Sequence, residues 1–170
     1  MRFFAILFLC LLPSGCGFES GGDSGGYHWG SLYRQDIHTV AVPIFSSRDF
    51  HRGVEFQLSE ALVKKIEAFT PYKVVPRERA DTVLEGEIVS IQPVTLALDP
   101  RTATPQQQLY SIVVNFTWKD LHTGKVLMSR EGFAQTTTFY PILGEGQFVG
   151  SQNSVEKLAL GIVEEMEAAW

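Results

Sequence analysis

Cysteine is scarce in this chain of 170 residues, where it occurs only as Cys10 and Cys16. Cys10 lies within an uninterrupted apolar run from Phe3 to Leu12, which follows the single charge of Arg2. This pattern is typical of a secretory signal segment, and about ten apolar residues are too few to span a bilayer. Removal of residues 1–15 would leave one thiol, so the processed chain would form no internal disulfide.

Clustered positive charge is also lacking. The formal net charge is −5, the pI is about 5.3, and lysine and arginine are spread along the chain. Because a nucleic-acid binder needs a basic face, no nucleic-acid partner is expected. After residue 16, no run approaches the roughly 20 apolar residues that a membrane-spanning helix requires.

What the sequence does contain is a motif around the second cysteine. The residues Leu12-Pro13-Ser14-Gly15-Cys16 resemble the lipobox of bacterial lipoproteins, with Pro13 at a position where leucine is usual. We therefore expect cleavage before Cys16 and lipid attachment to its thiol, with several acyl chains providing stable anchoring. Gly17 favours delivery to the outer membrane. The alternative is a secreted soluble protein with a free N-terminal cysteine.

Composition changes after the motif divide the chain into three parts. Residues 1–15 are the expected lipoprotein signal peptide. Residues 16–35 comprise the lipidated cysteine and a Gly/Ser-rich tether, which by flexible-chain scaling spans on the order of 20 Å. Residues 36–170 are expected to form a single domain, because this length suffices for one hydrophobic core.

Hydrophobic periodicity predicts the elements of this domain. Strands are expected at 37–45, 72–75, 82–92, 110–118 and 125–138, and helices at 54–69 and 152–169. Pro43 cannot donate a ladder hydrogen bond, which favours an edge position for the first strand. Two segments, 93–108 and 141–150, are predicted to be loops, and the first is long enough to suggest a functional surface.

Two amphipathic helices must bury their apolar stripes against a common layer. The expected fold class is therefore α+β: a two-layer α/β sandwich of about four to five mostly antiparallel strands, with both helices packed on one face. The second sheet face is predicted to retain apolar residues that suggest a protein partner, although ordinary scattered surface valines would explain them equally well. These residues are Val83, Val89, Ile91 and Val113.

Residues that could support catalysis or metal binding form no recognised pattern. The histidines at 28, 38, 51 and 122 lack partners at metal-ligand spacing, and no nucleophile elbow occurs. Glu85 and Glu87 share a strand face, which more often marks a solvated face than an acid/base pair. No catalytic residue, metal or cofactor is therefore expected.

Basic residues gather around one predicted turn, where Lys119, Lys125 and Arg130 lie close in sequence, and Arg101 occurs in the predicted loop 93–108. Such residues could bind a lipid phosphate or an acidic sugar. The alternative is a normally charged hairpin tip.

Several segments together resemble the LptE family of lipopolysaccharide-assembly lipoproteins. They are Cys16, Gly26-Tyr27, the segment TVAVPIF at 39–45, the segment ADTVLEGEI at 80–88, and the C-terminal helix ending in Trp170. The resemblance implies a non-enzymatic, lipid-anchored protein on the periplasmic side of the outer membrane. It would plug the large β-barrel LptD and assist lipopolysaccharide transport. Lys119, Lys125 and Arg130 then become candidate lipopolysaccharide contacts. A secretion pilotin or periplasmic scaffold is the alternative.

Overall fold

The structure is a computed structural model that describes residues 32–49, 52–141 and 147–167. The expected signal peptide and Cys16 lie outside the described residues. In chain order, the elements are β1 (Thr39–Ala41), β2 (Ser46–Ser47), α1 (Val54–Phe69), β3 (Lys73–Val74), the 3-10 helix η1 (Arg77–Arg79), β4 (Thr82–Leu98), β5 (Pro105–Asp120), β6 (Val126–Phe139) and α2 (Gln147–Glu164).

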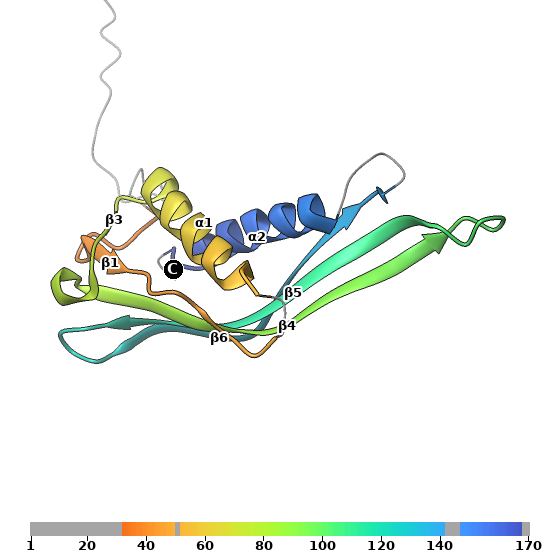
Figure 1. Ribbon diagram of the computed structural model, residues 1–170. Coiled ribbons are helices and arrows are strands. Elements are labelled where there is room, and N and C mark those ends of the chain that lie inside the picture. The colour runs from red at the N-terminus through yellow and green to blue at the C-terminus, as the bar shows by residue number, and fades with distance from the viewer. Residues whose placement is uncertain (1–31, 50–51, 142–146, 168–170) are drawn as a thin grey trace, which may run out of the picture. The chain divides into compact units, whose positions relative to one another are not determined.

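The strands form one mixed sheet in the order β3-β1-β4-β5-β6, with β2 pairing separately with β4. The short strands β1, β2 and β3 pair in parallel, whereas the long strands β4, β5 and β6 pair antiparallel. Both helices cover the same face of this sheet (Figure 1). The predicted α+β class and two-layer architecture are confirmed, with six strands rather than four to five.

Helix α1 has the bounds that its apolar periodicity predicts. Its first turn follows Gly53, whose φ of 97° is favourable for glycine and whose N–H donates to the Glu55 carboxylate at 2.9 Å. The helix ends where the Thr70 N–H and hydroxyl both donate to the Ile66 carbonyl, at 3.0 and 2.7 Å. Its buried residues form the stripe that faces the sheet: Val54, Leu58, Ser59, Ala61, Leu62 and Ile66.

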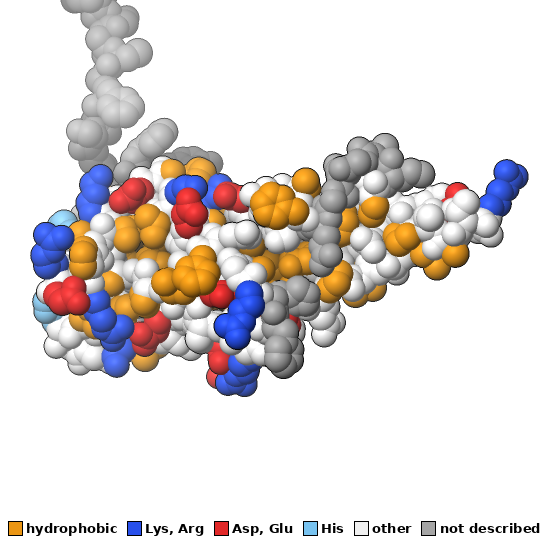
Figure 2. Space-filling model, viewed as in Figure 1, with side chains coloured by type: hydrophobic (Ala, Val, Ile, Leu, Met, Phe, Trp, Pro, Cys, Tyr) orange, Lys and Arg blue, Asp and Glu red, His pale blue; other side chains and the backbone are white. Residues whose placement is uncertain are grey.

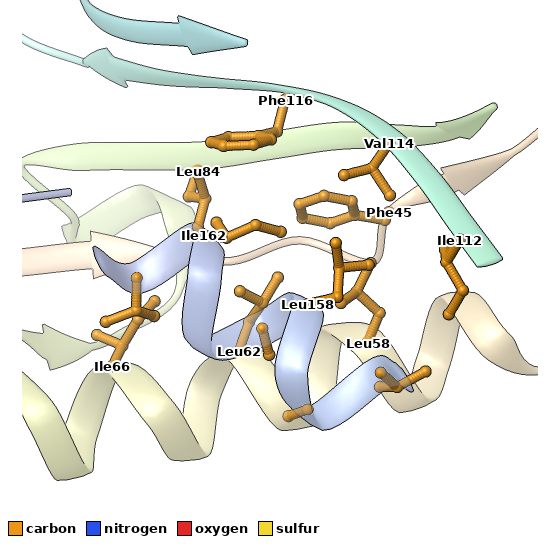
Figure 3. Close-up of a cluster of buried hydrophobic side chains, with 14 of the residues drawn as sticks. Phe45, Leu58, Leu62, Ile66, Leu84, Ile112, Val114, Phe116, Leu158 and Ile162 are labelled. Atoms are coloured by element: carbon orange, nitrogen blue, oxygen red, sulfur yellow. The ribbon is translucent and has the colours of Figure 1, made fainter. Parts of the chain in front are cut away.

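The main hydrophobic core lies between the helices and the sheet (Figure 3). Fully buried side chains come from both helices and from β5: Leu62 of α1, Leu158 and Ile162 of α2, and Val114 of β5. Phe116 of β5 is only 2% exposed. Contributions from both helices and the antiparallel strands make this one continuous core. The helices therefore depend on the sheet, because most helical stability in proteins comes from the packing of an amphipathic face.

One close approach within the core requires glycine. A Cβ atom on Gly86 of β4 would lie 2.5 Å from the Asn115 carbonyl oxygen and 2.5 Å from the Phe45 ring. The Phe45 ring thus packs directly on the β4 backbone. Gly161 in α2 is less constrained, since its Cβ would lie 3.1 Å from the far end of the Phe133 side chain.

The predicted loop at 93–108 is wrong. Strand β4 continues to Leu98 and β5 begins at Pro105, so most of this segment is an antiparallel ribbon that projects beyond the helices (Figure 1). The prolines misled the prediction. Pro93 lies on β4 beyond the point where β2 pairs with it, so its missing N–H costs no ladder bond on that side, and Pro105 opens β5.

The prediction that Ile91 lies on the second sheet face was wrong, because β4 contains a β-bulge before it. The register between β4 and β5 shifts between Ile88 and Ser90, so Val89 is an extra residue and the alternation reverses after it. Ile91 therefore points into the main core and is 3% exposed. Val83 also is buried, in a small cluster with Ala41 and Ala80.

Two further predicted boundaries were wrong. Strand β1 lies between β3 and β4 rather than at an edge, and it ends at Ala41, so Pro43 follows it. Helix α2 begins at Gln147 rather than at residue 152. Its first turn is held close to β6, because a Cβ on Gly150 would lie 2.5 Å from the Phe139 ring.

Replacing Gly86 with alanine is expected to destabilise the fold, because the new methyl group would meet backbone at Asn115 as well as the Phe45 ring. Overpacking of this kind typically costs about 1–3 kcal/mol of unfolding free energy, measurable by urea denaturation. Gly161→Ala is the matched control. Its neighbour is a movable ring edge and alanine favours helix, so it should change stability far less. Equal effects from the two substitutions would contradict the packing described for Gly86.

Candidate binding surface

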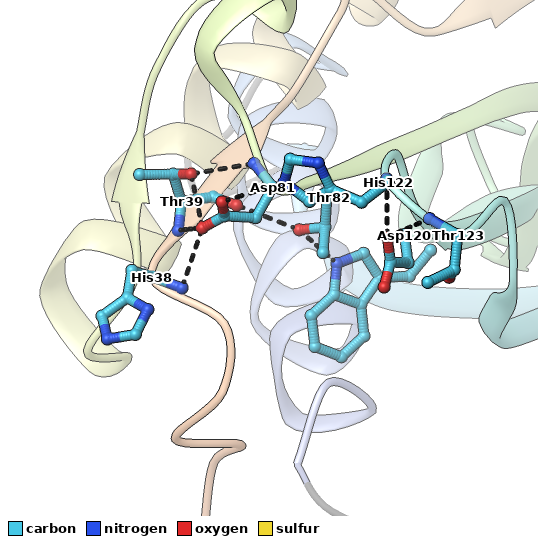
Figure 4. A network of polar contacts seen from close by, with 8 residues as sticks. His38, Thr39, Asp81, Thr82, Asp120, His122 and Thr123 are labelled. Carbon is cyan, nitrogen blue, oxygen red and sulfur yellow. Dashed lines mark hydrogen bonds and ion pairs between the residues drawn. The ribbon is translucent and has the colours of Figure 1, made fainter.

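A polar network at one end of the sheet joins β1, β4 and the β5–β6 turn (Figure 4). One carboxylate oxygen of Asp81 accepts hydrogen bonds from the His38 N–H at 3.2 Å, the Thr39 N–H at 2.9 Å and the Thr39 hydroxyl at 2.8 Å. The other oxygen lies 3.4 Å from the His122 ring. The network thus aligns the start of β4 with β1 and with the turn.

The hydrogen bonds donated by Thr39 and the backbone stabilise the ionised form of Asp81. They lower the pKa of this carboxyl from 3.8 to about 2, although burial opposes the shift. Two of the four histidines therefore contact this network: His38 through its backbone and His122 through its ring. His28 and His51 lie outside the described residues. Within those residues, no group of three or more His, Cys, Asp or Glu could hold a metal.

An open hollow of about 770 Å³ lies on the sheet at β4, β5 and β6. Its lining includes the charged side chains of Arg77, Glu85 and Glu87. Arg77 pairs with Glu85 at 3.1 Å, and Arg48 pairs with Glu87 at 2.7 Å. The two glutamates thus share a face, as predicted, and both take part in exposed ion pairs.

The predicted basic cluster separates into different environments. Lys119 lines the hollow, and no ion pair involves it within the described part of the chain. Lys125 lies in the β5–β6 turn, directly before Val126, which is the residue that pairs with Lys119. Arg130 also lines the hollow, but its guanidinium is paired with Glu165 at 2.6 and 2.8 Å.

Arg101 lies at the opposite end of the β4–β5 hairpin from Lys119. Pro105 and Lys119 are fourteen positions apart on β5, which corresponds to about 45 Å at the usual rise of a strand. The Asp99 carboxylate shapes the turn at this end by accepting from the N–H groups of Arg101 and Thr102, at 2.7 and 3.0 Å. Arg101 and Lys119 therefore cannot bind one small headgroup.

The ribbon carries exposed apolar side chains that the sequence-based loop prediction missed. Val94, Leu96 and Leu98 are 42%, 52% and 55% exposed. Figure 2 shows apolar side chains along this projecting part of the molecule. Their spacing of two residues was the available signal for a strand. Apolar groups gathered on a projecting ribbon are typical of an interaction surface.

Among the described residues, no helix is both long enough and apolar enough to span a membrane. The described fold belongs to the class of α+β sandwiches, and it carries an open charged hollow and an apolar ribbon.

Comparison with known families identifies the chain further. The model of the LptE family, described as lipopolysaccharide-assembly, matches residues 37–170. Since the match covers the whole described domain from Ile37 onward, the chain belongs to the LptE family. No curated protein matches the sequence significantly.

Solved structures share the fold at low sequence identity. The PelC dodecamer from Paraburkholderia phytofirmans is 17% identical, with a TM-score of 0.55 over 80% of this chain and 93% of that one. An uncharacterized lipoprotein B from Nitrosomonas europaea is 14% identical, with a TM-score of 0.52 over 78% and 83%. The hypothetical protein CT253 from Chlamydia trachomatis is 10% identical, with a TM-score of 0.52 over 76% and 98%.

The Asp81 network leads to a prediction about stability and pH. Asp81→Ala would leave the N–H groups of His38 and Thr39 without their acceptor, at a cost of about 1–2 kcal/mol near pH 7 after allowance for the 34% exposure of the carboxylate. Because folding lowers the pKa, this stability is complete above the ordinary value of 3.8 and is lost as pH falls through about 2.

Urea denaturation of both proteins over this pH range should show their stabilities converging in acid. Asp36→Ala is the control. Asp36 forms an exposed ion pair with Arg34, and loss of such a pair should change the unfolding free energy little. A pH-independent difference for Asp81→Ala would contradict the proposed role of its charge.

Proposed function

We propose that this chain is a lipid-anchored outer-membrane lipoprotein that binds within a large LptD-like β-barrel and assists lipopolysaccharide assembly. The observation that carries the proposal is the LptE family match over residues 37–170. In this role the chain binds and positions and catalyses no reaction. The periplasm-facing domain is held near the membrane by lipid on Cys16.

The ribbon supports binding to a large protein partner. Leu96 and Leu98 lie at the end of β4, in the ribbon that projects beyond the helices (Figure 1), and about half of each side chain is exposed. Burial of apolar surface is the main driving force of association, at roughly 25 cal/mol per Å². A barrel wall that contacts the ribbon would remove these side chains from water.

The hollow supports contact with the lipopolysaccharide itself. Lys119 lines it without an ion-pair partner in the described structure, and Lys125 is adjacent. Lipid A phosphates and acidic core sugars are suitable anions for such lysines. Arg130 is a weaker candidate, because binding an anion would require its guanidinium to leave Glu165.

Binding to the barrel is tested by affinity purification of the tagged, full-length protein from detergent-solubilised outer membranes. Mass spectrometry then identifies the co-purifying proteins. We expect an LptD-like barrel in roughly equal amount. The double variant Leu96→Asp and Leu98→Asp should reduce its recovery strongly, because charge on the ribbon opposes burial against an apolar wall.

Phe56→Asp is the matched control for this variant, since Phe56 is 57% exposed but lies on α1, outside both the ribbon and the hollow. In a second comparison, the Cys16→Ser variant should be lost from the membrane fraction, because residue 16 then has no thiol to acylate. Recovery of a secretin, or of no barrel, would contradict the proposal and favour a pilotin or scaffold.

Lipopolysaccharide contact is tested with purified protein and purified lipopolysaccharide. The double variant Lys119→Ala and Lys125→Ala should bind roughly threefold to tenfold more weakly, as expected for the loss of two charge-assisted contacts in a screened, exposed site. Lys64→Ala is the control, because Lys64 pairs with Glu60 on α1. Unchanged binding in the double variant would remove the hollow from consideration.

A further inference from the structure

Strand β6 is the last strand of the sheet, so one side of its backbone faces outward. It pairs with β5 only, and no other strand of the described residues lies against its outer side. Alternate N–H and C=O groups along such an edge can pair with another extended strand. The chemistry of the edge therefore specifies an extended polypeptide as the group that would cover it.

The second half of β6, Phe133–Phe139, lacks the features that usually protect an edge. It contains no charged residue and no proline, and its register with β5 is continuous from Phe133 to Phe139. By contrast, the preceding residues include Arg130, Glu131 and a shift of register near Gly132, whose φ is 66°. Charges and bulges block strand addition there but not in the second half.

The opposite edge of the projecting ribbon is protected. Beyond Ile88, β4 has no strand on its outer side, but it carries Pro93 and two further register shifts between Thr95 and Leu98. Proline and bulges both prevent regular strand addition. The outer edges of β4 and β6 thus differ, and of these two only the second half of β6 offers a regular, uncharged strand.

Exposed apolar side chains border the open segment. Tyr140 follows β6 directly and is 41% exposed, while Phe148 and Val149 in the first turn of α2 are 62% and 38% exposed. The contact of Gly150 with the Phe139 ring places this turn beside the end of the edge. A strand added to β6 would therefore bring apolar surface next to these residues.

The segment is complementary to itself. In an antiparallel pairing centred on Thr136, Phe133 faces Phe139 of the other strand, and residues of the same sheet face meet throughout. No like charges oppose each other, since the pairs are Phe133 with Phe139, Ala134 with Thr138, Gln135 with Thr137 and Thr136 with itself. We infer that Phe133–Phe139 pairs with the same segment of a second copy of this chain across a two-fold axis at Thr136.

This pairing describes the chain without its barrel partner and does not depend on barrel or lipopolysaccharide binding. Anchoring of both copies in one membrane would raise their effective concentration. The pairing would extend the sheet across both copies and cover the unprotected edge.

The experiment is disulfide cross-linking of the full-length protein carrying Thr136→Cys, in membranes and in detergent under mild oxidation. Residues opposite each other in antiparallel strands have Cα atoms about 4.5–5.5 Å apart, within disulfide range. We expect a covalent dimer linked through position 136. Gln92→Cys is the matched control, because Gln92 is also exposed on the sheet but lies on the protected edge.

The register can be checked with single and paired substitutions. Ala134→Cys alone should cross-link poorly, whereas Ala134→Cys combined with Thr138→Cys should cross-link well, because these positions face each other across the axis. Wild-type protein measures the background from Cys16.

A second measurement does not depend on cysteine. Thr136→Lys would place two positive charges opposite each other, so sedimentation equilibrium in detergent should show dimerisation weakened by roughly fivefold or more, with Gln92→Lys unchanged. A wild-type chain that is monomeric at all concentrations overturns the inference. So does cross-linking at position 136 that is no greater than at position 92, or that captures a different protein.

Discussion

The fold depends on the burial of two helical stripes against one face of a sheet whose central strand is β4. This strand pairs with β1, β2 and β5, and it lies beneath the Phe45 ring at Gly86. Removal of apolar side chains from water is the dominant favourable term in such packing. Because both helices lie on the same side, the other face of the sheet remains available for binding.

The binding features arise where the strands extend beyond the elements that cover them. Strands β4 and β5 continue past the helices as a ribbon, which leaves Leu96 and Leu98 in solvent. Strand β6 continues beyond the charges and bulge of its first half as a regular edge. Length and register, rather than a constellation of reactive side chains, therefore produce the surfaces from which partner binding is inferred.

Local patterns predicted some elements well. Helix α1 was recovered at its true bounds because its apolar residues recur at helical spacing and Thr70-Pro71 follows it. The ribbon was missed because prolines usually mark loops, although a free strand edge tolerates them. The lysines at 119 and 125 were found from their clustering, but the engagement of Arg130 with Glu165 joins residues 35 positions apart and left no local signal.

The sequence by itself determined the α+β class, the two amphipathic helices and the lipobox expectation at Cys16, because each follows from spacing or composition within short segments. Tertiary structure alone decided the faces on which residues lie after the Val89 bulge, the position of β1 inside the sheet, and the contrast between the outer edges of β4 and β6. The physical reason is that strand pairing joins distant segments. A one-residue change in its register moves every following side chain to the opposite face.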